Sequence, residues 1–217
     1  MSLAARREDR IKELADEISS GGGKALAIPT DVSDEQEARR LIETTKGELG
    51  SVDALINNAG VMLLGPILGA DVEHWQRMVN VNLLGLMYCT HAALPIMQEQ
   101  GSGHIVNVSS VAGRVARMGS GVYNATKWGV GAFSESLRQE ALHYGVRVTI
   151  VEPGYVDTEL QGHNEHPMVV ERMAKDKEQI GKVLEADDIA NAIVYAVTQP
   201  EHVSINEVLV RPTKQQG

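Results

Sequence analysis

The sequence predicts an α/β fold in which a doubly wound parallel sheet is covered by helices on both faces, giving three layers. Segments with helical spacing alternate with short apolar segments of strand length from one end of the chain to the other. Such alternation is typical of parallel sheets. The 217 residues contain no linker-like change of composition and no internal repeat, so we expect a single domain over residues 1–217.

The first helix is expected at residues 7–19, because apolar residues recur there at intervals of three and four. The glycines at 21–23 end this helix. The apolar stretch at 24–30 then has the length of a buried strand. Residues 3–5, which precede the helix, have the character of the last residues of another strand.

The next elements repeat this order. Ser33 or Asp34 is suited to cap a helix that runs to about residue 47, and residues 52–57 form a second apolar strand. The remaining expected elements are a long helix from Asp71 to about residue 97, a strand at 103–109, a helix at 123–144, a strand at 146–151 that Pro153 stops, a loop with one or two short helices at 155–182, a helix at 186–198 and a strand at 206–210.

Composition excludes several classes of function. The formal net charge of −9 argues against nucleic acid or an anionic membrane as a partner, because both recruit basic patches. Cys89 is the only cysteine, and no stretch approaches the ~18 consecutive apolar residues of a membrane span. His163 and His166 lack a third ligand at a diagnostic spacing, so we expect no metal. The expected location is the cytoplasm.

Tyr123 and Lys127 are the first candidates for catalysis. They lie four residues apart on an expected helix, so their side chains share one face. An ammonium about 4 Å from a phenol favours the phenolate by about 4 kcal/mol at an effective dielectric near ~20, which would bring the pKa of the tyrosine toward neutral. Alone, the pair is more typical of an exposed helix surface. Ser110, however, follows the strand at 103–109 at its carboxyl end, where ligands bind in open α/β sheets.

Five motifs, in order along the chain, resemble those of the short-chain dehydrogenase/reductase family. They are Asn57-Asn58-Ala59-Gly60, Val81-Asn82, Val108-Ser109-Ser110, Tyr123-Asn124-Ala125-Thr126-Lys127 and Pro153-Gly154. Each motif alone is weak, whereas the ordered set is specific and extends over essentially the whole chain. The resemblance implies a Rossmann-like fold and hydride transfer between a nicotinamide cofactor and a small alcohol or carbonyl substrate.

The resemblance also implies the catalytic roles. Tyr123 would be the acid/base, Ser110 would hydrogen-bond the reacting oxygen, and Lys127 would tune Tyr123 and hold the nicotinamide ribose. Asn82 would interrupt its helix and position a water between Lys127 and solvent, although it could equally be a polar residue tolerated within a long helix. Ser109 competes with Ser110, but the offset of 13 residues from Tyr123 favours Ser110, and successive strand residues point to opposite faces.

The family's cofactor contacts map onto further positions. Asp31 and Val32 match the pair that binds adenine, although both also suit a turn between a strand and a helix. The other matching positions lie near the adenosine ribose or cradle the nicotinamide carboxamide: Asn58, Ala59, Gly60, Pro153, Gly154 and Thr158, with Val156 packing nearby.

Arg6 and Arg7 directly follow the expected strand at 3–5. A basic pair at this place resembles NADP-dependent members of the family, because a guanidinium pairs with a 2′-phosphate whereas NAD enzymes place an acid there. Glu8 and Asp9 come later and suit the first helical turn. The alternative is that both arginines are merely solvated residues of a helix start. We therefore expect NADP rather than NAD.

Residues 205–213 resemble a branch of the family that includes NADP-dependent 3-hydroxy-acid, serine and clavulanate dehydrogenases. The substrate would be a secondary alcohol or ketone, and its identity would be set by residues 111–122 and 155–182. In this family the helices expected at 71–97 and 123–144 form the subunit interface. The resemblance therefore implies a homo-oligomer, either a tetramer or a dimer.

The family's first strand, with its glycine-rich turn and helix, has no counterpart in these residues. That strand normally lies in the middle of a 3-2-1-4-5-6 sheet, so we expect its two neighbours to lack a pairing partner. Gly21-Gly22-Gly23 is no substitute, because it follows a helix and precedes a strand. The alternative function is therefore that of a truncated, non-catalytic homologue serving as a scaffold or interaction protein.

Overall fold

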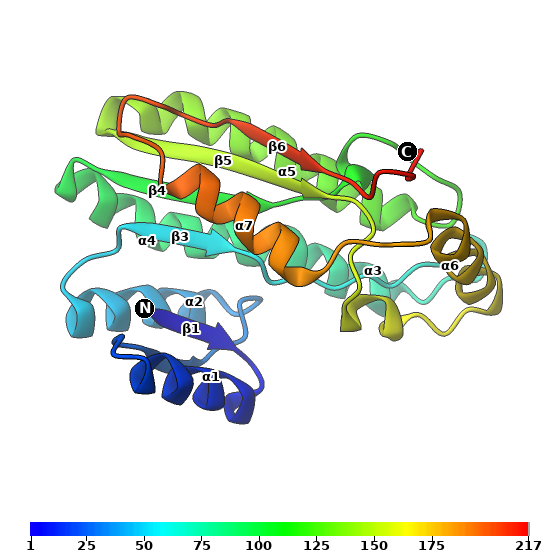
Figure 1. Ribbon diagram of the computed structural model, residues 1–217, viewed down its shortest axis with the longest axis horizontal. Helices are drawn as coiled ribbons and strands as arrows, with labels where there is room; N and C mark the ends of the chain where they lie inside the picture. The colour runs from blue at the N-terminus through cyan, green and yellow to red at the C-terminus, as the bar shows by residue number, and fades with distance from the viewer. Residues whose placement is uncertain (217) are drawn as a thin grey trace.

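Strands and helices alternate along the chain, which confirms the predicted α/β class (Figure 1). The structure is a computed structural model and describes residues 1–216. Its strands and longer helices are, in order, β1 (Ser2–Ala5), α1 (Glu8–Ser20), β2 (Leu26–Pro29), α2 (Glu35–Leu49), β3 (Ala54–Asn57), α3 (Val72–Val79), α4 (Leu86–Gln100), β4 (Gly103–Val108), α5 (Gly121–Ala141), β5 (Val146–Pro153), α6 (Pro167–Ile180), α7 (Ala186–Val197) and β6 (Glu207–Val210).

The strands form two separate parallel sheets. β1 pairs with β2 in one sheet, and the order in the other is β3-β4-β5-β6. Among residues 1–216, no strand lies between β1 and β3, so each of these two strands has an edge without a strand partner. The expected interruption of the sheet is therefore present. Figure 1 shows the β1–β2 unit below the larger sheet.

Helices cover both faces of the larger sheet. α4 and α5 pack on one face and α7 packs on the other (Figure 1). The main core lies under α4 and α5 and includes the fully buried Ile105, Met97 and Ala141, while Val106 and Val151 form a smaller core with Ile189 of α7. Because β4 and β5 are covered on both faces, most of their residues are buried, including the polar His104, Asn107 and Thr149.

The helix ends follow local rules of capping. Of the two caps considered from sequence, Asp34 is the one used, and its carboxylate accepts hydrogen bonds from the backbone amides of Gln36 and Glu37. Asp71 caps α3 in the same way. Gly101 and Gly145 adopt positive φ angles of 67° and 70° where α4 and the turn after α5 end, a conformation that suits glycine. These two glycines allow the chain to turn from the helices into β4 and β5.

The long helix predicted from Asp71 is continuous but not uniform. Between α3 and α4 it widens into a π-helix, η1, over Asn80–Gly85. From residue 72 to residue 100 it is long and apolar enough to cross a membrane. A core helix meets the same criterion, and this helix packs against α2, α5, β3 and β4.

The segment 155–182 is more helical than the sequence predicts. It contains a 3-10 helix, η4 (Glu159–His163), and then α6, which has 14 residues. Only Val169 and Ile180 of α6 are buried, so the apolar periodicity that would reveal this helix is weak. A bridge between Val156 and Leu184 joins the two ends of the segment.

Candidate active site

A cleft of about 670 Å³ follows the carboxyl ends of β3, β4 and β5. Its volume is typical of small-molecule sites, which range over roughly 300–1,000 Å³. A smaller cavity of about 160 Å³ adjoins it, and Ser110, Tyr123 and Gly154 line both. Leu160 and Gln161 also line both, so a group that reaches from one cavity into the other would pass these five residues.

Ser110 and Tyr123 meet where the two cavities join. Ser110 follows β4, and its hydroxyl accepts a hydrogen bond of 3.1 Å from the amide of Ala112, which fixes the turn. Tyr123 lies in the first turn of α5 and is hydrogen-bonded to Ser110. The neighbouring Ser109 instead donates to the carbonyl of Lys127 at 3.0 Å, and of the two serines only Ser110 lines both cavities.

Lys127 lies one turn after Tyr123 and is buried. Its ammonium donates a hydrogen bond of 2.9 Å to the carbonyl of Val108 and lies 5.8 Å from the centre of the Tyr123 ring. Burial lowers the pKa of Lys127 to about 8, because the charged ammonium is removed from water. The residue is therefore close to its titration point at slightly alkaline pH.

The expectation that Lys127 brings the pKa of Tyr123 toward neutral is wrong for this structure. Burial raises the pKa of Tyr123 to about 12, and the hydrogen bond with Ser110 opposes this rise only in part. The phenolate would lose its hydration in a site where Tyr123 is 7% exposed. The ammonium lies beside the ring and bonds to Val108. Tyr123 is thus protonated at neutral pH.

Asn82 lies within the π-helix η1 and is 1% exposed. Its side-chain oxygen accepts from the amide of Val61 at 2.7 Å, and its amide group donates to the carbonyl of Val61 at 2.8 Å and to the hydroxyl of Thr126 at 3.3 Å. The described hydrogen bonds of the Asn82 side chain thus connect the long helix to the loop after β3 and to α5. A residue merely tolerated in a helix would face solvent instead.

Most of the predicted cofactor contacts gather in the larger cleft. Its lining includes Arg7, Asn58, Gly60, Pro153, Gly154, Val156 and Thr158 together with Tyr123 and Lys127. Gly60 lies close to the catalytic group, since a β-carbon there would be 3.5 Å from the side-chain oxygen of Asn82. These positions bring backbone and hydroxyl donors to one side of the cleft.

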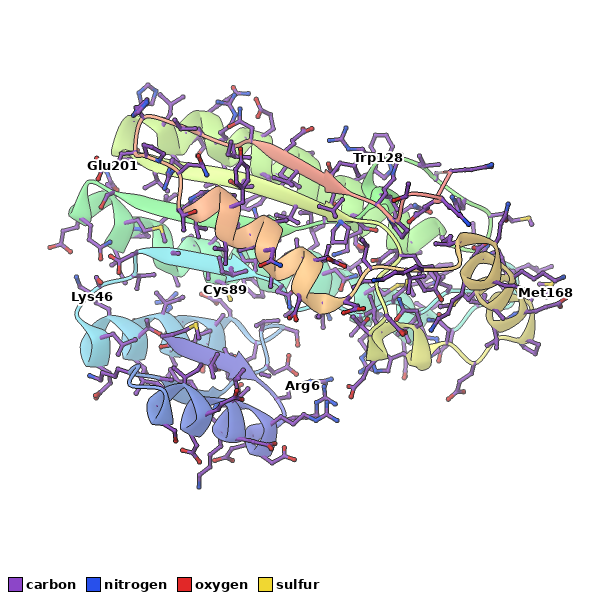
Figure 2. The ribbon with its side chains drawn as sticks, viewed as in Figure 1. Arg6, Lys46, Cys89, Trp128, Met168 and Glu201 are labelled. Atoms are coloured by element: carbon purple, nitrogen blue, oxygen red, sulfur yellow. The ribbon has the colours of Figure 1, made fainter. Side chains whose placement is uncertain are left out.

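Four predicted contacts lie beside the cleft and do not line it. Arg6 extends from the end of β1 (Figure 2) and approaches Asp31 at 4.0 Å, while Asp31 also accepts from the amide and hydroxyl of Ser33. Val32 packs on Gly85, where a β-carbon would be 2.8 Å from the Val32 side chain. Ala59 is the fourth residue of this group.

Sequence reasoning missed several residues that line the cavities. Arg10 and Glu159 lie with Arg7 at one end of the larger cleft, and Arg172 and Gln215 line the smaller cavity. Arg10 follows Arg7 by three residues on α1, so helical spacing could have identified it. Gln215 accepts from the amide of Tyr155 at 2.8 Å across 60 residues, a contact that no local pattern predicts.

The donor groups of the larger cleft suit a phosphorylated nucleotide. Arg7 and Arg10 supply guanidinium groups, and Lys127, Thr158 and Asn58 supply an ammonium, a hydroxyl and an amide. No group of three metal-ligating side chains occurs among residues 1–216. The cleft therefore offers charge complementarity for a nicotinamide dinucleotide.

Residues 1–169 match the family model described as short chain dehydrogenase. An uncharacterized oxidoreductase of Staphylococcus aureus (strain USA300) is 38% identical over 210 residues, which cover 97% of this chain and 85% of that protein. The closed form of serine dehydrogenase, complexed with NADP+, is 34% identical, with a TM-score of 0.88 over 100% of this chain and 86% of that one. An alcohol dehydrogenase from the archaeon Thermococcus sibiricus, complexed with 5-hydroxy-NADP, is 26% identical, with a TM-score of 0.86 over 100% and 87%.

Proposed function

The chain belongs to the short-chain dehydrogenase/reductase family of NAD(P)-dependent oxidoreductases, and from this premise we propose that it moves a hydride between NADP(H) and a secondary alcohol or ketone, with Tyr123 as acid/base. The observation that carries the proposal is the hydrogen-bonded pair of Tyr123 and Ser110 at the junction of the two cavities. The larger cleft would hold the cofactor and the smaller cavity the substrate.

The proton path follows from the positions of these groups. The nicotinamide, when bound, gives or takes the hydride. In the reductive direction, Ser110 holds the carbonyl oxygen and Tyr123 donates its phenolic proton to that oxygen. Because the pKa of Tyr123 is about 12, the residue is protonated at neutral pH and ready for this step. Lys127 would hold the ribose of the cofactor and assist the return of a proton.

Asn82 would act by holding the segments around it in position. Its paired bonds with Val61 hold the loop after β3 against η1, and the bond with Thr126 holds η1 against α5. Gly60, in the same loop, lies between this amide and Lys127, since its β-carbon position is 4.0 Å from the Lys127 ammonium. Asn82 would thereby fix the distance between the cofactor-binding loop and the catalytic helix.

The cleft also supports NADP as the cofactor. Arg7 lines the cleft and Arg6 directly precedes Arg7 after β1, so both could face a 2′-phosphate. The serine dehydrogenase and alcohol dehydrogenase structures named above are complexes with NADP or a modified NADP. Asp31 and Val32 would flank the adenine, Asn58, Ala59 and Gly60 the ribose, and Pro153, Gly154, Val156 and Thr158 the nicotinamide.

The smaller cavity supports a small substrate. Its volume of about 160 Å³ leaves room for only a few heavy atoms, and apolar Met62, Leu64 and Val115 share its wall with Arg172. A homo-oligomer is part of the proposal, because the helices that correspond to α4 and α5 form the subunit interface in this family, and Trp128 of α5 (Figure 2) is 51% exposed.

The test is titration of the purified chain with NADPH, followed by fluorescence or calorimetry. Saturable binding at micromolar concentrations, together with NADPH oxidation in the presence of small ketones, is the expected result. NADH in the same assay is the control for cofactor choice. Absence of binding up to millimolar NADPH would overturn the proposal and favour the scaffold alternative.

A further inference from the structure

Glu159, which lines the larger cleft, joins two distant parts of the chain. It is the first residue of η4 and directly follows Thr158. One of its carboxylate oxygens accepts a hydrogen bond of 2.8 Å from Arg7, and the other accepts one of 2.7 Å from Arg10. The partners are 152 and 149 residues away, on the β1–α1 unit.

Arg7 and Arg10 bind the Glu159 carboxylate in an arrangement in which they could equally bind a phosphate. Each guanidinium donates to a different oxygen of a single carboxylate, and a phosphate group offers oxygens at a similar spacing. Arg7, Arg10 and Glu159 all line the cleft that also contains Tyr123 and Lys127. The carboxylate therefore occupies a position in the cleft that suits an anionic group.

The pairs are open to exchange with solvent. The side chains of Arg7, Arg10 and Glu159 are 57%, 54% and 58% exposed, so a dissolved anion can reach both guanidinium groups. Ion pairs with this degree of exposure contribute little to stability. Hydrogen bonds from Arg10 and then Arg7 lower the pKa of Glu159 to about 2, which keeps the carboxylate charged at neutral pH.

We propose that Arg7 and Arg10 form a binding site for a phosphate group of the cofactor and that Glu159 occupies this site until the phosphate displaces it. The inference rests on the proposed function and adds Arg10 and Glu159 to it. Displacement would release η4, which lies next to the proposed nicotinamide contact Thr158. Binding of the phosphate would thus be coupled to the position of Thr158.

The first test measures the affinity of 2′,5′-ADP, which carries a 2′-phosphate but no nicotinamide. The variant Glu159→Gln removes the competing charge and should tighten binding about three- to tenfold, as expected for the loss of exposed pairs. Glu13→Gln is the matched control, since Glu13 also lies near Arg10 on α1 but does not line the cleft. It should change the affinity less than Glu159→Gln does.

A comparison of probes identifies the phosphate. ADP has a pyrophosphate but no 2′-phosphate, so tightening for 2′,5′-ADP alone assigns the site to the 2′-phosphate. Tightening for ADP as well assigns it to the pyrophosphate. Arg10→Ala should weaken whichever probe is affected, and calorimetry gives the dissociation constants.

The second readout is amide hydrogen exchange of residues 159–163. Addition of 2′,5′-ADP should accelerate exchange there in the wild-type chain, because the anchor of η4 is displaced, and should change nothing in Glu159→Gln. Equal affinities of the two chains for both probes would overturn the inference while leaving NADPH turnover, and thus the proposed function, intact. Failure of every nucleotide to bind would overturn both.

Discussion

The two ends of the larger cleft are built in different ways. At the catalytic end, Tyr123, Lys127 and Asn82 are 7%, 6% and 1% exposed, and the backbone carbonyls of Val108 and Val61 fix two of them. At the arginine end, Arg7 and its partner Glu159 are more than half exposed and meet only through their side chains.

This difference assigns a different physical control to each end. Desolvation sets the pKa values of Tyr123 and Lys127, since burial is the main cause of both shifts. Charge pairing, screened by solvent, dominates around Glu159. The catalytic end is therefore arranged before a ligand arrives, whereas the arginine end can exchange partners.

The largest expected effect comes from Tyr123→Phe. The variant removes the only proton donor proposed at the reacting oxygen and should lower kcat by about 1,000-fold or more, within the range known for general acid catalysis. The dissociation constant of NADPH should stay nearly unchanged, because the arginine end is untouched. Steady-state kinetics and calorimetry measure the two quantities. Substantial remaining turnover would show that another group transfers the proton.

Sequence reasoning found the catalytic end because its residues are close in sequence or follow a strand. Tyr123 and Lys127 share one helical face, and Ser110 follows β4. The predicted direction of the Tyr123 pKa shift was wrong, because spacing along a helix predicts which side chains lie close together but not how deeply they are buried. Here the loss of hydration outweighs the neighbouring ammonium.

The arginine end could be predicted only in part, for a related reason. Arg7 was identified from its position after β1, but its partner Glu159 is 152 residues away and meets it only through the tertiary structure. The fold itself was largely predictable, since short strand-length segments alternate with segments of helical spacing along the chain. α6 was underestimated because only two of its residues are buried.

A second variant at the catalytic end, Lys127→Met, should raise stability while it abolishes turnover. Lys127→Met replaces a buried ammonium with an apolar chain of similar length. The lowered pKa of Lys127 indicates that its charge is costly, so the free energy of unfolding at pH 7 should rise by about 2 kcal/mol. Turnover should be lost. Urea denaturation measures the stability.

Arg10→Met is the matched variant at the other end. It removes the same charge from an exposed position and should change the stability little. A less stable Lys127→Met chain would show instead that the buried ammonium and its bond to Val108 stabilise the fold, and the contrast between the two ends would then be incorrect.

A third effect tests recognition at the arginine end. Arg6→Ala combined with Arg7→Ala should raise the dissociation constant of NADPH about tenfold, as expected for the loss of charge-assisted hydrogen bonds near solvent. NADH affinity should remain the same, because NADH lacks the 2′-phosphate. Of the single variants, Arg7→Ala should have the larger effect, since Arg7 lines the cleft and Arg6 lies beside it. Equal weakening of both cofactors would exclude recognition of the 2′-phosphate.

The smallest expected effect is the dependence of stability on pH that Lys127 contributes at the catalytic end. The pKa of Lys127 falls from its ordinary 10.5 to about 8 in the folded chain, so between these values the unfolded chain binds more protons and stability rises with pH. From pH 7.5 to pH 9, this residue should add about 1 kcal/mol to the free energy of unfolding. Burial raises the pKa of Cys89 and Tyr123, which act in the opposite direction at higher pH. The difference between wild type and Lys127→Met, measured at both pH values, isolates the contribution of Lys127. An identical pH dependence in both chains would mean that the Lys127 ammonium keeps its ordinary pKa, and desolvation would no longer distinguish the two ends of the cleft.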